Sequence, residues 1–567
     1  MRFSPTAPKE KIIILFLVPL LLFPGLLPFM PLMEPDEARY SDIPSMMNRT
    51  GDYVTPKLHH VVYLEKPPLA YWATAFFFRL LGENEFSSRL FAGLSAWGCV
   101  ILAFFMGRRL RDEQTGLYAA AILSTFLFHF ILARINILDM PLTFFVALAI
   151  WSCYLFLEGG RRGWLYLAYF ACALAFLTKG LIGLVFPFVI NGMLLAWERR
   201  WRDIPRMISP VGLMIFAAVS MPWIVMVQEA NPDFFRFFFI QEHFLRYTTK
   251  MHGREGAFLY YLPVMILGTL PWSAFLWKAK QDADVRWRDL FGRSGMGILL
   301  IWIACVFFFY SVSSSKLIPY AGPMFIPAAV LFARVFREAG ERKPEISGRP
   351  ASGLSRIPIV LQSVLFIAVL LAPLALKNME FGRDLVIMQS DYWPALILAP
   401  VLLQIMLIFV PDLAGRRWKR GWFAAIYGIS ALFLGSMVFP MSDFLTPYKS
   451  AQPLARAIRQ SVPADALVYQ YKIALYGIDF YNKIRTPIVE DFGELGFGIE
   501  KLPPEERARY FLSAGDFYRL CKEEREVYCV TQYARRLDEL KKEIPGGRIL
   551  WDNDAFFLLK IEAKGDR

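Results

Sequence analysis

The stretch "KIIILFLVPLLLFPGLLPFMPLMEPDEARYSDIP" (residues 11–44) joins a long apolar run to a group of acids. The apolar run ends at Met33, and the carboxylates Glu34, Asp36 and Glu37 follow it at once. An apolar run of this length predicts a helix that spans a membrane. Desolvating a charged group at the membrane interface costs free energy, so ionisable residues at that depth are candidates for function.

The rest of the chain repeats this apolar pattern. Of its 567 residues, 56% are hydrophobic and 20% are charged. Apolar runs of roughly 20 residues, the length that spans a bilayer, alternate with short charged loops. This composition excludes an ordinary soluble protein and predicts a polytopic α-helical membrane protein. The N-terminus resembles a signal peptide, but its apolar core is long and no small-residue cleavage site follows, which favours an uncleaved anchor.

The net charge of +13 raises the question of a nucleic-acid partner. Most of the excess lies in short loops such as "GRRLRD", "ERRWRD" and "GRRWKRG". Clusters of this kind between apolar spans set membrane topology, and they form no continuous basic face along the sequence. We therefore expect no nucleic-acid partner.

Hydropathy predicts about thirteen spans. They lie near residues 11–33, 89–106, 116–133, 141–157, 164–178, 181–197, 209–227, 258–277, 297–312, 319–336, 357–375, 393–411 and 422–440. If the N-terminus is cytoplasmic, every loop on the cytoplasmic side carries at least two Lys or Arg; these loops are 107–114, 158–163, 198–206, 278–289, 337–350 and 411–421. The positive-inside rule supports this assignment, and the odd count sends the C-terminus outside.

The predicted organisation has two parts. Residues 1–440 form a transmembrane catalytic domain whose first outer loop, 34–88, carries helices at the membrane surface. Residues 441–567 form a soluble outer domain, because the strand-like runs at 466–471, 486–490, 526–530, 548–552 and 555–560 alternate with helical stretches. We expect an α/β or α+β fold there, in which Cys521 and Cys529 could pair if the domain lies in an oxidising compartment.

Acidic residues gather in the first outer loop. A helix is expected from Asp36 to Asn48, since Pro35 suits a helix start, and a second helix within "LEKPPLAYWATAFFFRLLG". The ordinary explanation is that acids favour a helix N-terminus and that Glu65 and Lys66 form a surface pair. Other outer segments change this balance, because they place further ionisable groups on the same side: Asp139, Glu242, His243, Arg246, Tyr247, Lys316 and Tyr320.

Carboxylates beside cations suit one type of reaction. A carboxylate takes the proton of a hydroxyl or amine nucleophile, and Lys or Arg stabilises a departing phosphate. With apolar helices alongside, that phosphate can belong to a lipid. A polyprenyl phosphate is a good leaving group, so no separate general acid is required.

The pattern "DEARYSDIP…GDYVTPKL…YLEKPPLAYW" resembles the first outer loop of the lipid A aminoarabinose transferases. These are relatives of the protein O-mannosyltransferases in the GT-C superfamily of membrane glycosyltransferases (glycosyltransferase families 39 and 83). The runs "EHFLRY", "HGREGAFLYYLPVMILGTLPW" and "SKLIPYAGPMFIPAAVL" also resemble later segments of that family. The similarity is strong over about residues 1–340 and implies a GT-C fold.

The resemblance implies a role for each matching residue. Asp36 is the catalytic carboxylate, and Asp139 stands beside Lys66 or orients it. Lys66 and Arg246 hold the lipid-linked phosphate, with Tyr320 and Lys316 beside them. The motif around Tyr320 departs from the family, since it reads "KLIPY" where a Lys-Leu-Pro-Thr-Tyr type run is usual.

The resemblance also implies a zinc-like divalent metal held by Glu65 and His243. The alternative for His243 is a hydrogen-bonded histidine at the membrane interface. Supporting roles fall to Glu37, Arg39 and Tyr40, of which Arg39 and Tyr40 can simply brace Asp36. The pair His59–His60 is interpreted as part of a loop.

Three functions remain in competition. The leading hypothesis is an inverting glycosyltransferase that moves a sugar from undecaprenyl phosphate to lipid A, another glycan or a protein, at the outer face of a bacterial inner membrane. The sugar stays open among aminoarabinose, mannose, galactosamine and arabinofuranose. A lipid or sugar transporter would show mid-span charges, broken paired helices and internal symmetry, none of which the sequence predicts. A scaffold that only displays the C-terminal domain is the third.

Overall fold

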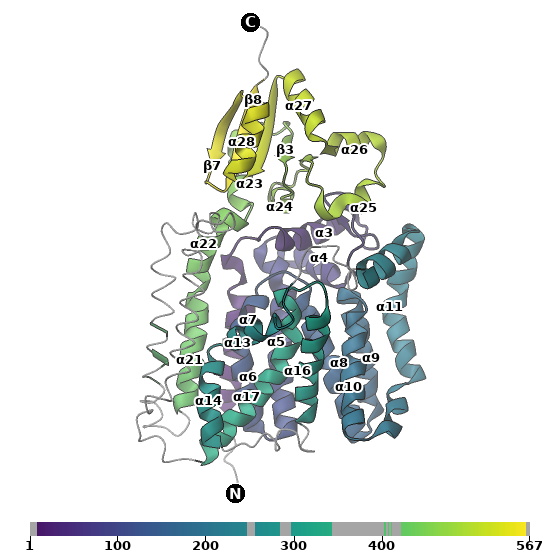
Figure 1. Ribbon diagram of the computed structural model, residues 1–567, viewed down its shortest axis with the longest axis vertical. Coiled ribbons are helices and arrows are strands. Elements are labelled where there is room, and N and C mark those ends of the chain that lie inside the picture. Colours follow the sequence, from purple (N-terminus) through teal and green to yellow (C-terminus); the bar gives the residue numbers. More distant parts are fainter. Residues whose placement is uncertain are drawn as a thin grey trace.

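The computed structural model describes residues 8–245, 256–283, 296–342, 402–403, 406–407, 410 and 421–562. A bundle of long helices forms its larger part. Helices α3 (Asp36–Thr50) and α4 (Leu69–Leu81) lie across one end of this bundle, and the C-terminal sheet stands above them (Figure 1). The helix that the sequence predicts from Asp36 is α3, and it ends where Gly51 takes the left-handed conformation with φ 73°.

Six helical stretches in the described part of the chain are long and apolar enough to cross a membrane: Lys9–Phe29, Glu85–Leu110, Asp139–Gly159, Pro210–Ala230, Ile318–Ala339 and Gly421–Lys449. They establish a polytopic helical membrane protein. The count of thirteen spans stays a prediction, since 357–375 and most of 393–411 lie outside the described residues. The bundle comprises α1 (Pro8–Ile12), η1 (Ile13–Leu17), α2 (Val18–Leu20), η2 (Leu21–Gly25), η3 (Leu27–Phe29), α5 (Glu85–Leu110), α6 (Glu113–Ser124), α7 (Leu127–Leu132), α8 (Asp139–Gly159), α9 (Arg162–Lys179), α10 (Ile182–Trp197), α11 (Pro210–Ala230), α13 (Tyr261–Gly268), α14 (Trp272–Ala283), α16 (Gly297–Val312), α17 (Gly322–Arg342), α21 (Gly421–Ser436) and α22 (Val438–Lys449).

Two predicted spans are broken, which corrects the expectation of continuous helices. The span 116–133 divides into α6 and α7, and the span 258–277 divides into α13 and α14. The breaks are neighbours: the Leu127 amide donates to the Leu270 carbonyl at 3.1 Å. Trp272 Nε1 donates to Thr125 Oγ1 at 2.9 Å. Each break thus satisfies backbone groups freed by the other, as a low-dielectric interior demands.

Ion pairs show which loops share an end of the bundle. At one end Lys11 pairs with Glu113, Arg111 pairs with Glu338, and Arg337 lies 3.5 Å from Asp112. These residues belong to the N-terminal segment and to two loops that the charge pattern places in the cytoplasm. The first outer loop and the loop before α8 meet instead below the C-terminal sheet, so the two groups of loops are separated as the topology predicts. Which compartment each end faces stays a prediction.

The C-terminal part contains a mixed six-stranded sheet in the order β5-β4-β3-β6-β8-β7. Its elements are α23 (Gln452–Ser461), β3 (Val468–Tyr471), α24 (Tyr476–Asn482), β4 (Ile488–Val489), η8 (Gly493–Leu495), α25 (Gly496–Ile499), α26 (Pro504–Tyr510), β5 (Phe511–Leu512), α27 (Ala514–Glu523), β6 (Glu526–Gln532), α28 (Ala534–Glu543), β7 (Gly547–Asp552) and β8 (Phe556–Glu562). Strands β3, β4 and β5 pair in parallel, and β6, β8 and β7 pair antiparallel.

All five strand-like runs of the tail contain strands. Strand β5 lies outside these five runs: it follows α26 directly, and its residues Phe511 and Leu512 pair with β4 in the sheet. Cys521 and Cys529 are buried free thiols. The domain boundary at residue 440 and the outer location of the sheet stay predictions.

The hydrogen bond between the two helix breaks can be tested with a matched pair of variants. Trp272→Phe removes the indole donor to Thr125, whereas the buried Trp302 Nε1 has no hydrogen-bond partner among the described residues. Both indoles are completely buried. We expect Trp272→Phe to lower the free energy of unfolding by about 1 kcal/mol more than Trp302→Phe. Thermal unfolding of the detergent-solubilised chain measures this; equal losses would contradict it.

Candidate active site

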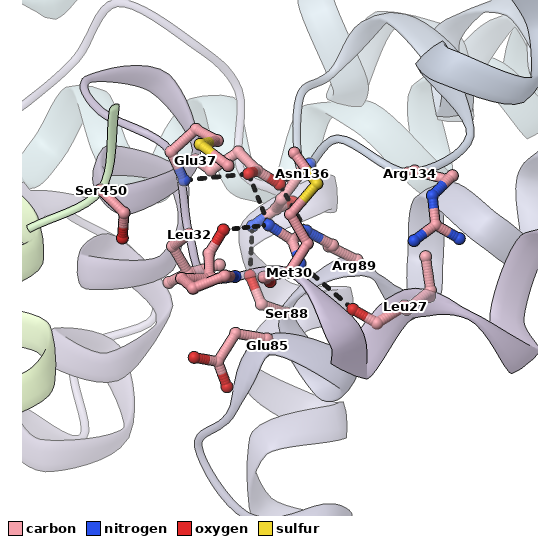
Figure 2. A network of polar contacts seen from close by, with 12 residues as sticks. Leu27, Met30, Leu32, Glu37, Glu85, Ser88, Arg89, Arg134, Asn136 and Ser450 are labelled. Carbon is pink, nitrogen blue, oxygen red and sulfur yellow. Dashed lines mark hydrogen bonds and ion pairs between the residues drawn. The ribbon is translucent and has the colours of Figure 1, made fainter. Parts of the chain in front are cut away.

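Glu37 is the most constrained of the three acids that follow the first span. Its carboxylate receives two hydrogen bonds from Arg89, at 2.7 Å each, and both side chains are about 1% exposed. The backbone amides of Met33 and Asn136 also donate to it, at 3.0 and 2.8 Å (Figure 2). With both oxygens occupied, Glu37 is a structural anion and unsuited to accept a substrate proton.

Arg89 lies in the second turn of α5 and also binds the end of the first span. Its guanidinium donates to the carbonyls of Leu27 at 3.1 Å and Pro31 at 2.8 Å, and to that of Met30 (Figure 2). Helix ends leave carbonyls without partners, and a buried end requires a donor for them. Arg89 therefore fixes the chain that leads into α3 at two places, the end of the first span and Glu37 itself.

Asn136 connects this network to a second site residue. Its side-chain amide donates to the Tyr40 carbonyl at 3.1 Å and to Ser88 Oγ at 2.9 Å. Three residues later Asp139 begins α8. The same buried hydrogen bonds thus position the start of α3, which carries Asp36, and the loop that presents Asp139.

Glu34 is buried against the C-terminal part of the chain. Its Oε1 accepts a 2.6 Å hydrogen bond from the Gly477 amide, and its own amide donates to the Lys449 carbonyl at 2.7 Å. Burial raises the pKa of this carboxyl from 4.5 to about 8, against the lowering effect of its backbone hydrogen bonds. At neutral pH Glu34 is mainly a neutral acid, and it does not serve as a base.

Asp36 is the accessible member of the three. Its side chain is 60% exposed at the first position of α3, and Arg39 approaches it to 3.7 Å. Arg39 is itself buried and pairs with Glu494 from the C-terminal part, which also accepts a 3.1 Å hydrogen bond from the Tyr63 hydroxyl. Next to Arg39, the Tyr40 ring stacks on that of Tyr71 at 5.9 Å.

Glu65 and Lys66 lie in the same loop as Tyr63. Lys66 Nζ is 3.6 Å from the Glu65 carboxylate and 3.0 Å from the Glu65 carbonyl, and its side chain is mostly buried. Burial, and next the charge of Glu65, raise the pKa of Tyr63. Arg39 acts on the same hydroxyl in the opposite direction. Asp36, Arg39, Glu494 and Tyr63 are thus joined by direct contacts, and the Glu65–Lys66 pair follows Tyr63 in the same loop.

Asp139 forms a second polar group with a residue that the sequence analysis missed. Lys179 Nζ lies 2.6 Å from Asp139 Oδ1, and it also lies over the ring of Tyr320, 4.7 Å from the centroid. The Tyr320 ring stacks on Tyr310. Lys316 is buried and donates to the Ser313 carbonyl at 2.7 Å. The ion pair of Asp139 is with Lys179, and the implied place of Asp139 beside Lys66, or its role in orienting Lys66, stays a prediction.

Several functional candidates carried little sequence signal. Lys179 follows directly after the predicted span 164–178, at its outer end, so the predicted topology places it on the same side as Asp139. A lysine on that side, away from the basic cytoplasmic loops, is the signal that could have marked it as a candidate. Glu494 belongs to the tail, where no motif marked it. Two other predicted residues, the Arg246 side chain and the His243 side chain, lie outside the described part of the structure.

Among the residues whose side chains the structure describes, none of the predicted ligands forms a metal site. Glu65 is engaged with Lys66, and no group of three or more His, Cys, Asp and Glu residues in the described chain is arranged to hold a metal ion. Structural and catalytic zinc sites use at least three protein ligands. No step of the chemistry below passes through a metal.

The neutral state of Glu34 gives a testable dependence of stability on pH. Because the folded chain holds this proton more tightly than the unfolded chain, wild-type stability falls as pH rises from 4.5 towards 8. Glu34→Gln lacks this ionisation, so its Tm relative to wild type should rise between about pH 5 and about pH 9. Melting curves across this range test the point, and a Tm difference that is constant with pH would refute it.

Known proteins resemble this chain in sequence over most of its length. Residues 65–226 match the model of the dolichyl-phosphate-mannose-protein mannosyltransferase family. The chain is 27% identical over 524 residues to the undecaprenyl phosphate-alpha-4-amino-4-deoxy-L-arabinose arabinosyl transferase of Erwinia tasmaniensis, and the alignment covers 90% of each protein. A similarly named enzyme from Pseudomonas fluorescens is 32% identical over 332 residues, which is 55% of each protein.

The fold is also found in a solved structure. ArnT from Cupriavidus metallidurans bound to undecaprenyl phosphate superposes with a TM-score of 0.80 at 23% identity, covering 99% of this chain and 100% of that one. Its apo form gives 0.79. The chain is therefore a membrane glycosyltransferase with the GT-C fold, and it resembles the aminoarabinose transferases.

Proposed function

We propose that this chain transfers a sugar from undecaprenyl phosphate to lipid A, or to another acceptor, at the outer face of a bacterial inner membrane. The sugar is 4-amino-4-deoxy-L-arabinose or a related pentose or hexose. One observation carries the proposal: of three adjacent acids, only Asp36 is open to a substrate, and Arg39 and Glu494 connect it to Tyr63 in the loop that carries Lys66. The names of the relatives, and the undecaprenyl phosphate in the ArnT structure, support the identity of the donor.

The reaction is a single displacement. Asp36 accepts the proton of the acceptor hydroxyl as its oxygen forms a bond to the anomeric carbon of the sugar. The bond from that carbon to the phosphate oxygen breaks, and its electron pair leaves with the polyprenyl phosphate. Because attack and departure occur on opposite faces, the anomeric configuration inverts. Asp36 releases its proton to water after the product leaves.

Cationic residues stabilise the phosphate as its charge develops. Lys66 is assigned the principal contact, with Arg246, Lys316 and Tyr320 beside it. Lys179 joins this set through Tyr320, and Asp139 orients Lys179 through their 2.6 Å ion pair. Glu37, Arg39 and Tyr40 hold α3 in place and do not touch the reacting atoms.

A transporter is the second candidate, because broken helices are a feature of many transporter folds. The breaks seen here join a hydroxyl, an indole and backbone groups, and the residues at them are uncharged. Proteoliposomes loaded with the lipid-linked sugar distinguish the two functions. Sugar appearing on the acceptor supports transfer, whereas movement of the intact donor across the bilayer without reaction supports transport.

The base can be tested with a control only two residues away. Asp36→Asn removes the proton acceptor and should reduce transfer by at least about 100-fold, the range expected for loss of a general base. Glu34→Gln makes the same carboxylate-to-amide change at a buried position and should retain most of the activity. Rates are measured as mass-shifted lipid A after incubation with the lipid-linked donor. An Asp36→Asn protein as active as Glu34→Gln would exclude Asp36 as the base.

A further inference from the structure

Several stretches of the C-terminal part contact the membrane domain, and one of them is residues 492–502, which we name the bridging segment. It contains η8 and α25 (Figure 1). Glu494 binds Arg39 and Tyr63 of the first outer loop. Lys501 lies 3.1 Å from Asp233, just beyond the end of α11. The bridging segment thus contacts two outer segments that are far apart in the sequence.

Its central contact is an aromatic one. Phe497 stacks on Phe237 with ring centroids 4.1 Å apart and an interplanar angle of 28°. Phe237 belongs to η5 (Arg236–Leu245) and is buried. Offset stacking of this kind stabilises a contact beyond the effect of the area it buries.

The same apolar cluster includes the first outer loop. Leu64, Phe234, Phe237 and Phe238 are buried in it, and residues packed against them include Val54, Val62, Trp72 and Phe497. Leu64 is two residues before Lys66 in the sequence. One small core therefore joins the loop of Lys66, the segment after α11 and the bridging segment.

Gly498 shows how closely the bridging segment approaches this loop. A Cβ atom at position 498 would lie 2.2 Å from the Val62 carbonyl oxygen, a distance that no side chain tolerates. Only glycine permits the two backbones to come this close. The close backbone contact between the bridging segment and the first outer loop therefore depends on the glycine at position 498.

We infer that Phe497 is a positioning residue for the donor: through the cluster it holds Leu64, and with it Lys66, where the phosphate of the lipid carrier binds. The inference rests on the proposed function. Phe497 touches no reacting atom, so its loss weakens binding of the lipid phosphate while the chemical step of bound donor proceeds at nearly its normal rate. Small displacements of a binding group are sufficient for such losses.

The test measures the Kd of the purified full-length chain for undecaprenyl phosphate, together with kcat and KM for transfer. Phe497→Ala should raise the Kd and KM about tenfold, a coupling of about 1.4 kcal/mol. Its kcat should stay within about twofold. Phe497→Tyr keeps the stacked ring and should restore the wild-type Kd. Trp551→Ala removes a comparable aromatic from edge strand β7 and should leave the Kd unchanged.

Lys66→Met separates failure of the inference from failure of the proposed function. If Lys66→Met weakens binding and Phe497→Ala does not, the inference is wrong and the proposed function stands. If the wild-type chain itself binds no undecaprenyl phosphate, the proposed function is wrong. Should Phe497→Ala not fold, Phe497→Leu replaces it, and a wild-type Kd for that variant overturns the inference.

Discussion

The buried ion pair between Glu37 and Arg89 is the interaction on which the rest of the site depends. Two charges with about 1% exposure each would be very unfavourable alone, and a buried pair is retained only when its remaining donors and acceptors are also satisfied. Here the remaining guanidinium N–H groups bind carbonyls at the end of the first span, and the carboxylate accepts from the amides of Met33 and Asn136. The pair therefore holds the residues between the end of the first span and the start of α3 in one position, and this fixed segment is the platform from which α3 begins.

From this platform the three neighbouring acids acquire different properties. The carboxylate of Glu37 is fully occupied by its ion pair with Arg89, and burial keeps the carboxyl of Glu34 neutral. The carboxylate of Asp36, at the first position of α3, remains exposed to solvent and to a substrate. Asn136 donates hydrogen bonds to the Glu37 carboxylate and to the Tyr40 carbonyl, so the loop that leads to Asp139 is attached to the start of α3. The C-terminal part contributes from above through Glu494 and Phe497. The site is thus assembled from segments that are hundreds of residues apart, and its parts are held together by buried polar contacts.

Local patterns made much of this predictable. The helix from Asp36, the sorting of loops between the two ends of the bundle and five of the six strands of the C-terminal sheet follow from signals within a few residues; β5 (Phe511–Leu512) does not. Long-range pairing was not predictable. Arg89 is the first residue of a predicted span, and nothing in the sequence shows that it binds Glu37. Nor does the sequence show that Lys179 forms an ion pair with Asp139. A hydropathy average over a whole span also misses the helix breaks near Thr125 and Trp272. These breaks are stable because the polar groups at them form hydrogen bonds with one another, and those bonds exist only in the folded bundle.

The most direct measurement is the effect of Glu37→Gln on both stability and transfer. Leaving Arg89 buried without its anion should cost about 3–5 kcal/mol of unfolding free energy. In the fraction that folds, displacement of Asp36 should slow transfer by about 100-fold. Glu85→Gln, whose carboxylate binds the neutral donors Gln452 and Tyr481, is the matched control and should change both quantities far less. A Glu37→Gln protein with wild-type stability and wild-type transfer would contradict the account.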